Sequence, residues 1–239
     1  MTEINFSERF KEFFSDKKKY RIERQGISYT VFTLIIIIAL EIIAYLGFLR
    51  NISGFLSHYG IWIFYLDITV VALMFALWHI FAYKTRVSCM VGMMIGMTIG
   101  MQTGILIGTI IGATNGFFTG AMTGMSLGVI VGAFAGKICG IMGVMEGLMA
   151  GVMGGTMGPM ISVMMFFDNL YIFMPFFMMI NLLIILCLSC MYFYEVVEGD
   201  QNIVRRPTDG LTFAVICIIV IFVLMIIMIY GHKSVAFNF

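Results

Sequence analysis

Hydrophobic residues in this sequence gather into long stretches that short polar segments interrupt. Most stretches are about 20 residues or longer, the length that an α-helix needs to cross the hydrocarbon core of a bilayer. Their approximate bounds are 27–49, 60–83, 87–113, 117–136, 138–167, 170–194 and 211–230. The pattern predicts an all-α membrane protein with about seven transmembrane helices, which form a single domain over residues 27–230.

Glycine dominates the middle of the chain. Every fourth residue from Gly92 to Gly140 is glycine, and after a one-residue slip the spacing resumes from Gly143 to Gly158. Backbone polar groups must pair internally in a bilayer, so we expect this run to be helical despite its glycines. Small residues four apart let helix backbones approach closely, which predicts a GxxxG-packed core of helices three to five. The Asn115-Gly116 dipeptide predicts a turn between the third and fourth helices, although one segment of the run could be re-entrant.

Basic residues fall mostly on one side of the predicted membrane. Residues 1–26 hold seven of the fourteen Lys and Arg residues, and the apolar spacing there is typical of an amphipathic helix on the membrane surface. A solvated charged tail is the alternative for this segment. With the N-terminus in the cytoplasm, 12 of the 14 basic residues lie in inner segments. We therefore expect a cytoplasmic N-terminus, a short outer tail over residues 231–239, and a location in the cell membrane.

The composition excludes several classes of function. The chain is 61% hydrophobic and 11% charged, whereas soluble domains carry about 25% charged residues. A net charge of +1 gives no reason to expect a nucleic-acid partner. The sequence contains no nucleotide-binding loop, zinc signature or catalytic triad, so we expect a protein that is not an enzyme. Its five cysteines lie in or beside apolar stretches, unlike the disulfide framework of a small secreted protein.

Methionines form a stripe along the fifth predicted helix, roughly opposite its glycines. At about 100° per residue, one face carries a thiol, a carboxylate and a row of thioethers. These residues are Cys139, Met142, Met145, Glu146, Met149, Met153, Met157, Met160 and Met164, and the third helix adds Met97 and Met101. Thiol and thioether sulfurs are soft ligands that select Cu(I) and similar ions. The pattern predicts a soft-metal path with an internal face, while packing or lipid contact by the methionines is the alternative.

Two further groups of residues are candidates for chemistry inside the membrane. Glu41 and Asp67 lie at a similar depth below the outer ends of the first two helices, so they could form a cation site or share a proton. Each could instead be neutral and hydrogen-bonded to a neighbouring helix. Cys187 and Cys190 form a CxxC pair on the sixth helix, which could bind a ligand, undergo redox chemistry, or remain inert.

The combination of MxxxM with GxxxG resembles short segments of the copper-uptake Ctr family, whose three-helix subunits form trimers. The present sequence departs from that family in its seven predicted spans. Met97 and the Gly108–Gly112 pair also do not reproduce the family's spacing. The resemblance therefore transfers no residue roles to this chain.

These observations predict a membrane transporter or channel for a cation, with Cu(I) or another soft metal as the candidate ion. The path would run along the methionines and Glu146. The alternative is a non-catalytic scaffold or subunit of a larger membrane complex, and a third interpretation is a thiol-redox protein. We expect the partners to be the lipid bilayer and either further copies of the chain or a larger complex. No cofactor is assigned, apart from Cu(I) as a bound or transported ion.

Overall fold

A computed structural model describes residues 21–47, 55–84, 87–166, 168–193, 204–205 and 210–233. Most of the predicted N-terminal surface helix, the first loop with Arg50, and most of the tail lie outside these residues.

Seven long helices make up nearly all of the described chain. They are α2 (Arg21–Gly47), α3 (Phe55–Ala82), α4 (Cys89–Asn115), α5 (Phe117–Gly136), α6 (Ile141–Met165), α7 (Leu170–Tyr192) and α8 (Gly210–Tyr230). All seven are long and apolar enough to cross a membrane. The prediction of an all-helical fold with about seven helices able to span a membrane is therefore confirmed, and these helices favour an integral membrane protein. A short antiparallel pair, β1 (Tyr83–Lys84) with β2 (Val204–Arg205), joins the connections that follow α3 and α7.

Two glycines make the turns within the glycine-rich run. Gly116 has φ 101° between α4 and α5, and Gly140 has φ 83° before α6, which are conformations that residues with a Cβ rarely adopt. The predicted turn at Asn115-Gly116 is therefore confirmed. The predicted start of the fifth helix at residue 138 is wrong, because a short 3₁₀ turn, η2 (Lys137–Cys139), intervenes before Ile141. The slip in glycine spacing thus coincides with a break in the helix.

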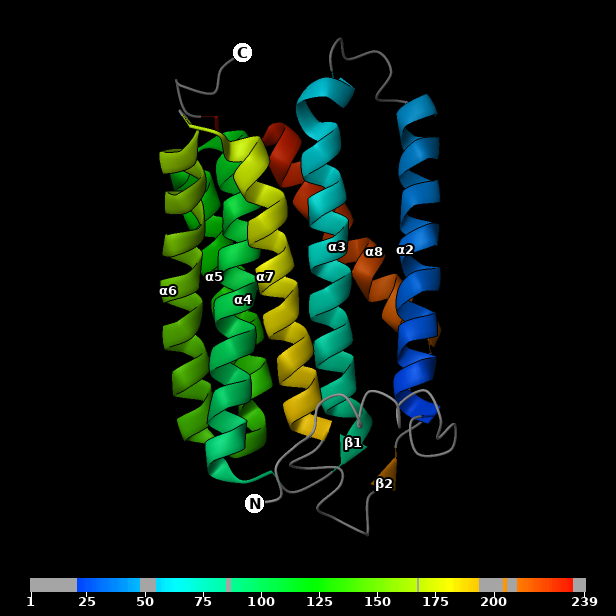
Figure 1. The fold of residues 1–239 in the computed structure, drawn as a ribbon, viewed down its shortest axis with the longest axis vertical. Coiled ribbons are helices and arrows are strands. Elements are labelled where there is room, and N and C mark those ends of the chain that lie inside the picture. Colours follow the sequence, from blue (N-terminus) through cyan, green and yellow to red (C-terminus); the bar gives the residue numbers. More distant parts are fainter. Residues whose placement is uncertain are drawn as a thin grey trace.

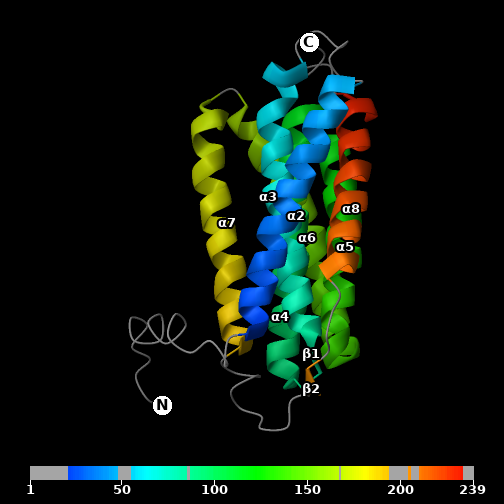
Figure 2. The same ribbon diagram turned by 90° about the vertical axis from the view of Figure 1, so that its right-hand side faces the viewer.

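The helices form two regions that differ in packing. Helices α4, α5 and α6 lie together on one side of the molecule, which we call the three-helix cluster (Figure 1). Helix α2 lies at the opposite side, with α3 and α7 between, and α8 crosses obliquely against α3 and α2 (Figures 1 and 2). Helix α2 begins at one end of the bundle, and α8 ends at the other (Figure 1). A chain with an odd number of spans places its two ends in this way.

Backbone meets backbone within the three-helix cluster. A Cβ atom built on Gly104 would lie 2.5 Å from the backbone nitrogen of Gly155, and one on Gly120 would lie 2.7 Å from the Cα of Gly112. A Cβ on Gly128 would lie 3.0 Å from the Cα of Gly151. Real Cβ contacts are almost never as short as the first two distances, and the third is tighter than most, so a larger residue at these positions would require the helices to move apart.

Large side chains fill the space between helices in the other region. The core there includes Trp62 and Leu66 of α3, Met174 of α7 and Leu224 of α8. At the end of the bundle near β1, the hydroxyl of Tyr192 donates a hydrogen bond to the carbonyl of Ile80 at 3.0 Å, which ties α7 to α3. This packing separates the helix backbones and leaves room for polar side chains between them.

Candidate functional site

The methionine stripe of α6 faces away from the other helices of the chain. Its seven methionines, from Met142 to Met164, are between 45% and 65% exposed, and Glu146 is partly exposed on the same side. Gly143, Gly147 and Gly151, on the opposite side, are buried against α4 and α5. The expectation that this face is internal is therefore wrong within a single chain, because the glycine face of α6 makes the contacts with its neighbours.

The methionines predicted on the third helix do not enclose a path either. Met97 of α4 is 49% exposed and Met101 is partly exposed. Among the described residues, no three His, Cys, Asp or Glu side chains lie close enough together to hold a metal ion. The stripe residues Met142, Met145, Met149, Met153 and Met157 lie on an exposed face of the single chain, and metal binding by them stays a prediction.

Cys139 does not belong to the methionine stripe. It ends η2, two residues before α6 begins, and it lies against the start of α4. Its Sγ atom lies 2.7 Å from the Sγ of Cys89 and donates a hydrogen bond to the Cys89 carbonyl oxygen at 3.0 Å. Sequence reasoning missed Cys89 as a partner, although both cysteines lie at the same predicted membrane face. Cys187 and Cys190 are both exposed on α7, far along the chain from this pair.

Glu41 and Asp67 meet at the contact between α2 and α3. Their carboxyl groups lie close enough to interact electrostatically. Asp67 is 1% exposed, whereas Glu41 is partly exposed. Asp67 lies about 12 Å inside the span that begins at Tyr59, at 1.5 Å of rise per residue. The similar depth deduced from the sequence thus corresponds to a pairing in space.

Within the described residues, three oxygens of this carboxyl pair have no hydrogen-bond partner. Both carboxyl oxygens of Asp67 and Oε1 of Glu41 are buried and meet no donor there. Two ionised carboxylates at this depth would repel each other in a medium that solvates neither. The arrangement therefore suits a bound proton or another small cation.

A positive charge lies near the N-terminal end of α3. The Lys233 ammonium donates a hydrogen bond to the Tyr59 hydroxyl and lies 5.2 Å from the centre of the Tyr59 ring. Tyr59 precedes Asp67 by about two helical turns. Lys233 is therefore held by Tyr59 at the end of the α3 span that lies about two turns before Asp67.

The structure buries His79 between α3 and α7. Its Nδ1 atom lies 2.9 Å from the Ser189 hydroxyl, and its ring makes edge contacts with Tyr83 and Tyr192. Its exposed fraction is 2%. These contacts give His79 a structural role in joining α3 to α7.

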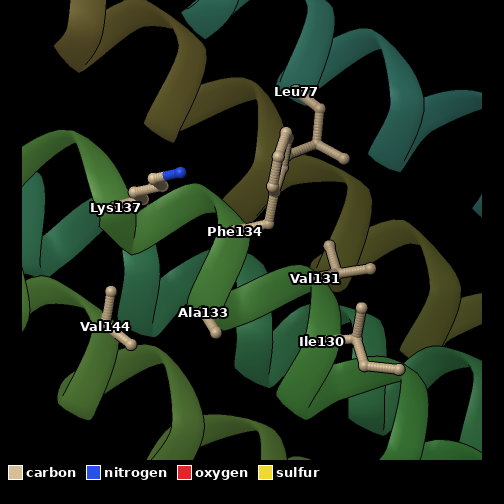
Figure 3. Close-up of a pocket in the computed structure, with 7 residues that line it drawn as sticks. All are labelled: Leu77, Ile130, Val131, Ala133, Phe134, Lys137 and Val144. Atoms are coloured by element: carbon tan, nitrogen blue, oxygen red, sulfur yellow. The ribbon is translucent and has the colours of Figure 1, made fainter.

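A shallow groove of about 560 Å³ lies on the outside of the bundle, beside α5. Leu77 of α3 faces Phe134 of α5 across it, and its other lining residues are Ile130, Val131, Ala133, Lys137 and Val144 (Figure 3). Lys137 is the only lining residue that carries a charge or a polar side chain. This groove lacks the convergent polar groups typical of a catalytic or small-molecule site.

Comparison with known proteins leaves the function to be argued from this geometry. No family model matches the chain, and neither a curated protein nor a solved structure shows significant similarity to it. The Glu41–Asp67 pair is the best-defined buried polar site in the part of the chain that the structure describes, and the outward methionine face of α6 is the second candidate.

Proposed function

We propose that this protein is a membrane transporter or channel for a cation, and that the Glu41–Asp67 pair is its ion-handling centre. The observation that carries the proposal is the burial of Asp67 beside Glu41, with no hydrogen-bond partner for either Asp67 carboxyl oxygen among the described residues. An acidic residue at the centre of a membrane helix costs about 2.5–3.5 kcal/mol on insertion scales, and such residues usually belong to ion or proton pathways. A structural role alone would not require two of them in contact.

The orientation and the glycine packing belong to the same proposal. The N-terminus would lie in the cytoplasm and the C-terminus outside, with helices α4 to α6 held together by their GxxxG spacing. Pairing of β1 with β2 supports the orientation, because it joins Lys84 and Arg205 at one membrane face. Close approach of Gly104 to Gly155 supports the packing.

Proton flux into proteoliposomes tests the carboxyl pair. The vesicles carry a pH-sensitive dye, and a potassium gradient with valinomycin sets the membrane potential. Glu41→Gln and Asp67→Asn should each lower the flux roughly tenfold or more, because each removes a titratable group from the pair. Glu146→Gln serves as the matched control, since that carboxyl lies on the outward face of α6 and should leave the flux unchanged.

A second candidate path involves a soft metal on the outward face of α6. The methionines and Glu146 share that face, and a carboxylate that faces lipid is costly unless another protein surface covers it. Copies of the chain that meet through this face would enclose a row of thioethers suited to Cu(I). Ag(I), a stable substitute for Cu(I), should then enter the vesicles, and Met149→Leu with Met153→Leu should abolish its binding and entry.

Methionines on other helices provide the control for the soft-metal experiment. Met122 of α5 and Met179 of α7 are 54% and 59% exposed, so Met122→Leu with Met179→Leu removes two thioethers without touching α6. Equal Ag(I) binding by both double variants would exclude the α6 path. Vesicles that carry neither protons nor Ag(I) would refute the transport proposal altogether.

The alternative is that the same face docks another membrane protein, so that the chain acts as a scaffold or subunit. In that case Glu146→Gln should weaken assembly without changing any ion flux. This alternative would be favoured over transport if a stoichiometric partner co-purified with the protein from native membranes and if the Glu146 variant lost that partner.

A further inference from the structure

Two cysteines that are distant in sequence meet at one end of the three-helix cluster. Cys89 is the first residue of α4, and Cys139 is the last residue of η2. Their Sγ atoms are 2.7 Å apart, and the Cys139 thiol also donates to the Cys89 carbonyl oxygen at 3.0 Å. Both contacts bring Cys139 against the first turn of α4.

Gly92 makes this approach possible. It lies one helical turn after Cys89, and a Cβ atom built on it would collide with the Cβ of Cys139. Any larger residue at position 92 would therefore push Cys139 away from α4. The turn at Gly140, with φ 83°, then redirects the chain into α6 immediately after the thiol.

The spacing of the two sulfurs suits a covalent bond better than a shared metal ion. Thiolates on a tetrahedral metal with bonds of about 2.3 Å lie about 3.8 Å from each other. A disulfide brings its sulfurs to about 2.05 Å. The observed 2.7 Å separation lies much nearer to the second value, so bond formation requires a smaller movement.

We propose that Cys89 and Cys139 form a reversible intramolecular disulfide when a hydroperoxide oxidises them. One thiolate attacks the peroxide oxygen and becomes a sulfenic acid, which releases water from hydrogen peroxide. The second thiol then attacks that sulfur, and a second water leaves as the S–S bond forms. Two thiols lose two electrons and two protons, and one hydrogen peroxide is reduced to two waters.

Both sulfurs are accessible to a small oxidant. Cys89 is exposed and Cys139 is partly exposed, at the membrane face that the charge pattern assigns to the cytoplasm. Thiols are the resting form in that compartment, and disulfides there are mostly transient and regulatory. The pair therefore responds to oxidation and returns to thiols on reduction.

The bond would close the chain from the start of α4 to the end of η2, which encloses α4 and α5 entirely. It would fix the turn between α5 and α6 to the first turn of α4. Oxidation thus locks one end of the three-helix cluster, because these segments can no longer separate there. This device is independent of any ion that the protein carries.

The experiment uses the full chain in lipid nanodiscs, with Cys187→Ser, Cys190→Ser and Cys217→Ala in place to leave only the proposed pair. Hydrogen peroxide should remove both maleimide-reactive thiols, lower the intact mass by two hydrogens, and raise Tm. Dithiothreitol should reverse all three changes. Cys89→Ser and Cys139→Ser should each abolish the mass loss and the rise in Tm.

A glycine variant tests the geometry without removing a thiol. Gly92→Ala should slow disulfide formation severalfold or more, whereas Gly47→Ala should not, because a Cβ on Gly47 meets nothing within 4 Å. Gel filtration of each variant confirms that it is folded. The proposal would be overturned if both thiols could still be alkylated after treatment with peroxide. It would also be overturned if peroxide formed disulfides between chains and not the internal bond.

Discussion

The three-helix cluster and the region built from α2, α3, α7 and α8 solve membrane packing in opposite ways. The most buried helix of the cluster is α4, with 78% of the residues in its apolar window buried, and the most buried helix of the other region is α3, with 50%. Glycine brings the backbones of α4, α5 and α6 into contact, while side chains such as Trp62 and Leu66 separate the helices elsewhere. The Glu41–Asp67 pair lies in the second region. Contact between backbones leaves no room for an ion-handling side chain, whereas packing through side chains does.

Enlarging a glycine within the cluster should have the largest effect. Gly104→Val would place its side chain against the backbone of Gly154 and Gly155, which cannot move aside as a flexible side chain can. We expect a loss of about 3 kcal/mol or more in the free energy of unfolding. Thermal unfolding in detergent and the yield of monodisperse protein measure it.

Gly47→Val is the control for that substitution, because a Cβ at the end of α2 meets nothing within 4 Å. Equal stability of the two variants would mean that close approach of the backbones does not hold the cluster together.

Removing the carboxyl pair should separate stability from function. Replacing a buried ion pair by apolar residues often leaves the free energy of unfolding unchanged or raises it by about 1–4 kcal/mol. We expect the double variant Glu41→Leu with Asp67→Leu to be as stable as the original protein or more stable for the same reason. Tm should stay constant or rise while proton flux in proteoliposomes is lost. A marked fall in Tm would instead indicate that the pair is a structural contact between α2 and α3.

A smaller loss is expected where a single hydrogen bond joins α3 to α7. Tyr192→Phe removes the hydroxyl that donates to the Ile80 carbonyl and should cost about 1 kcal/mol in the free energy of unfolding. Tyr230→Phe, at a position that is 83% exposed, should cost much less. Thermal unfolding of the two variants gives the comparison, and equal values would assign the α3–α7 contact to apolar packing alone.

The smallest effect on stability should come from the outward face of α6. Met149→Leu with Met153→Leu alters two exposed side chains, so we expect a change of about 0.5 kcal/mol or less in the monomer. A larger loss, seen only in membranes or at high protein concentration, would show that another protein surface covers this face. Analytical ultracentrifugation in detergent distinguishes the two results.

Much of the fold follows from the sequence because the bilayer limits the choices. Apolar segments long enough to span must be helices, and Gly116 provides the positive φ that a tight turn requires. The seven spans and this turn were therefore predictable. A break between residues 136 and 138 was also predicted, but its extension to Gly140 was not, because Ile138 and Cys139 continue the hydrophobic pattern.

The sequence by itself determined where the helices lie and which residues share a face on each of them. Only the tertiary structure decided which face is covered: it turned the glycines of α6 inward and the methionines outward, and it placed Cys139 against Cys89. It also brought Asp67 into contact with Glu41. The physical reason is that lipid tails are as apolar as the protein interior, so hydrophobicity along a membrane helix does not distinguish a buried side from a lipid-facing one.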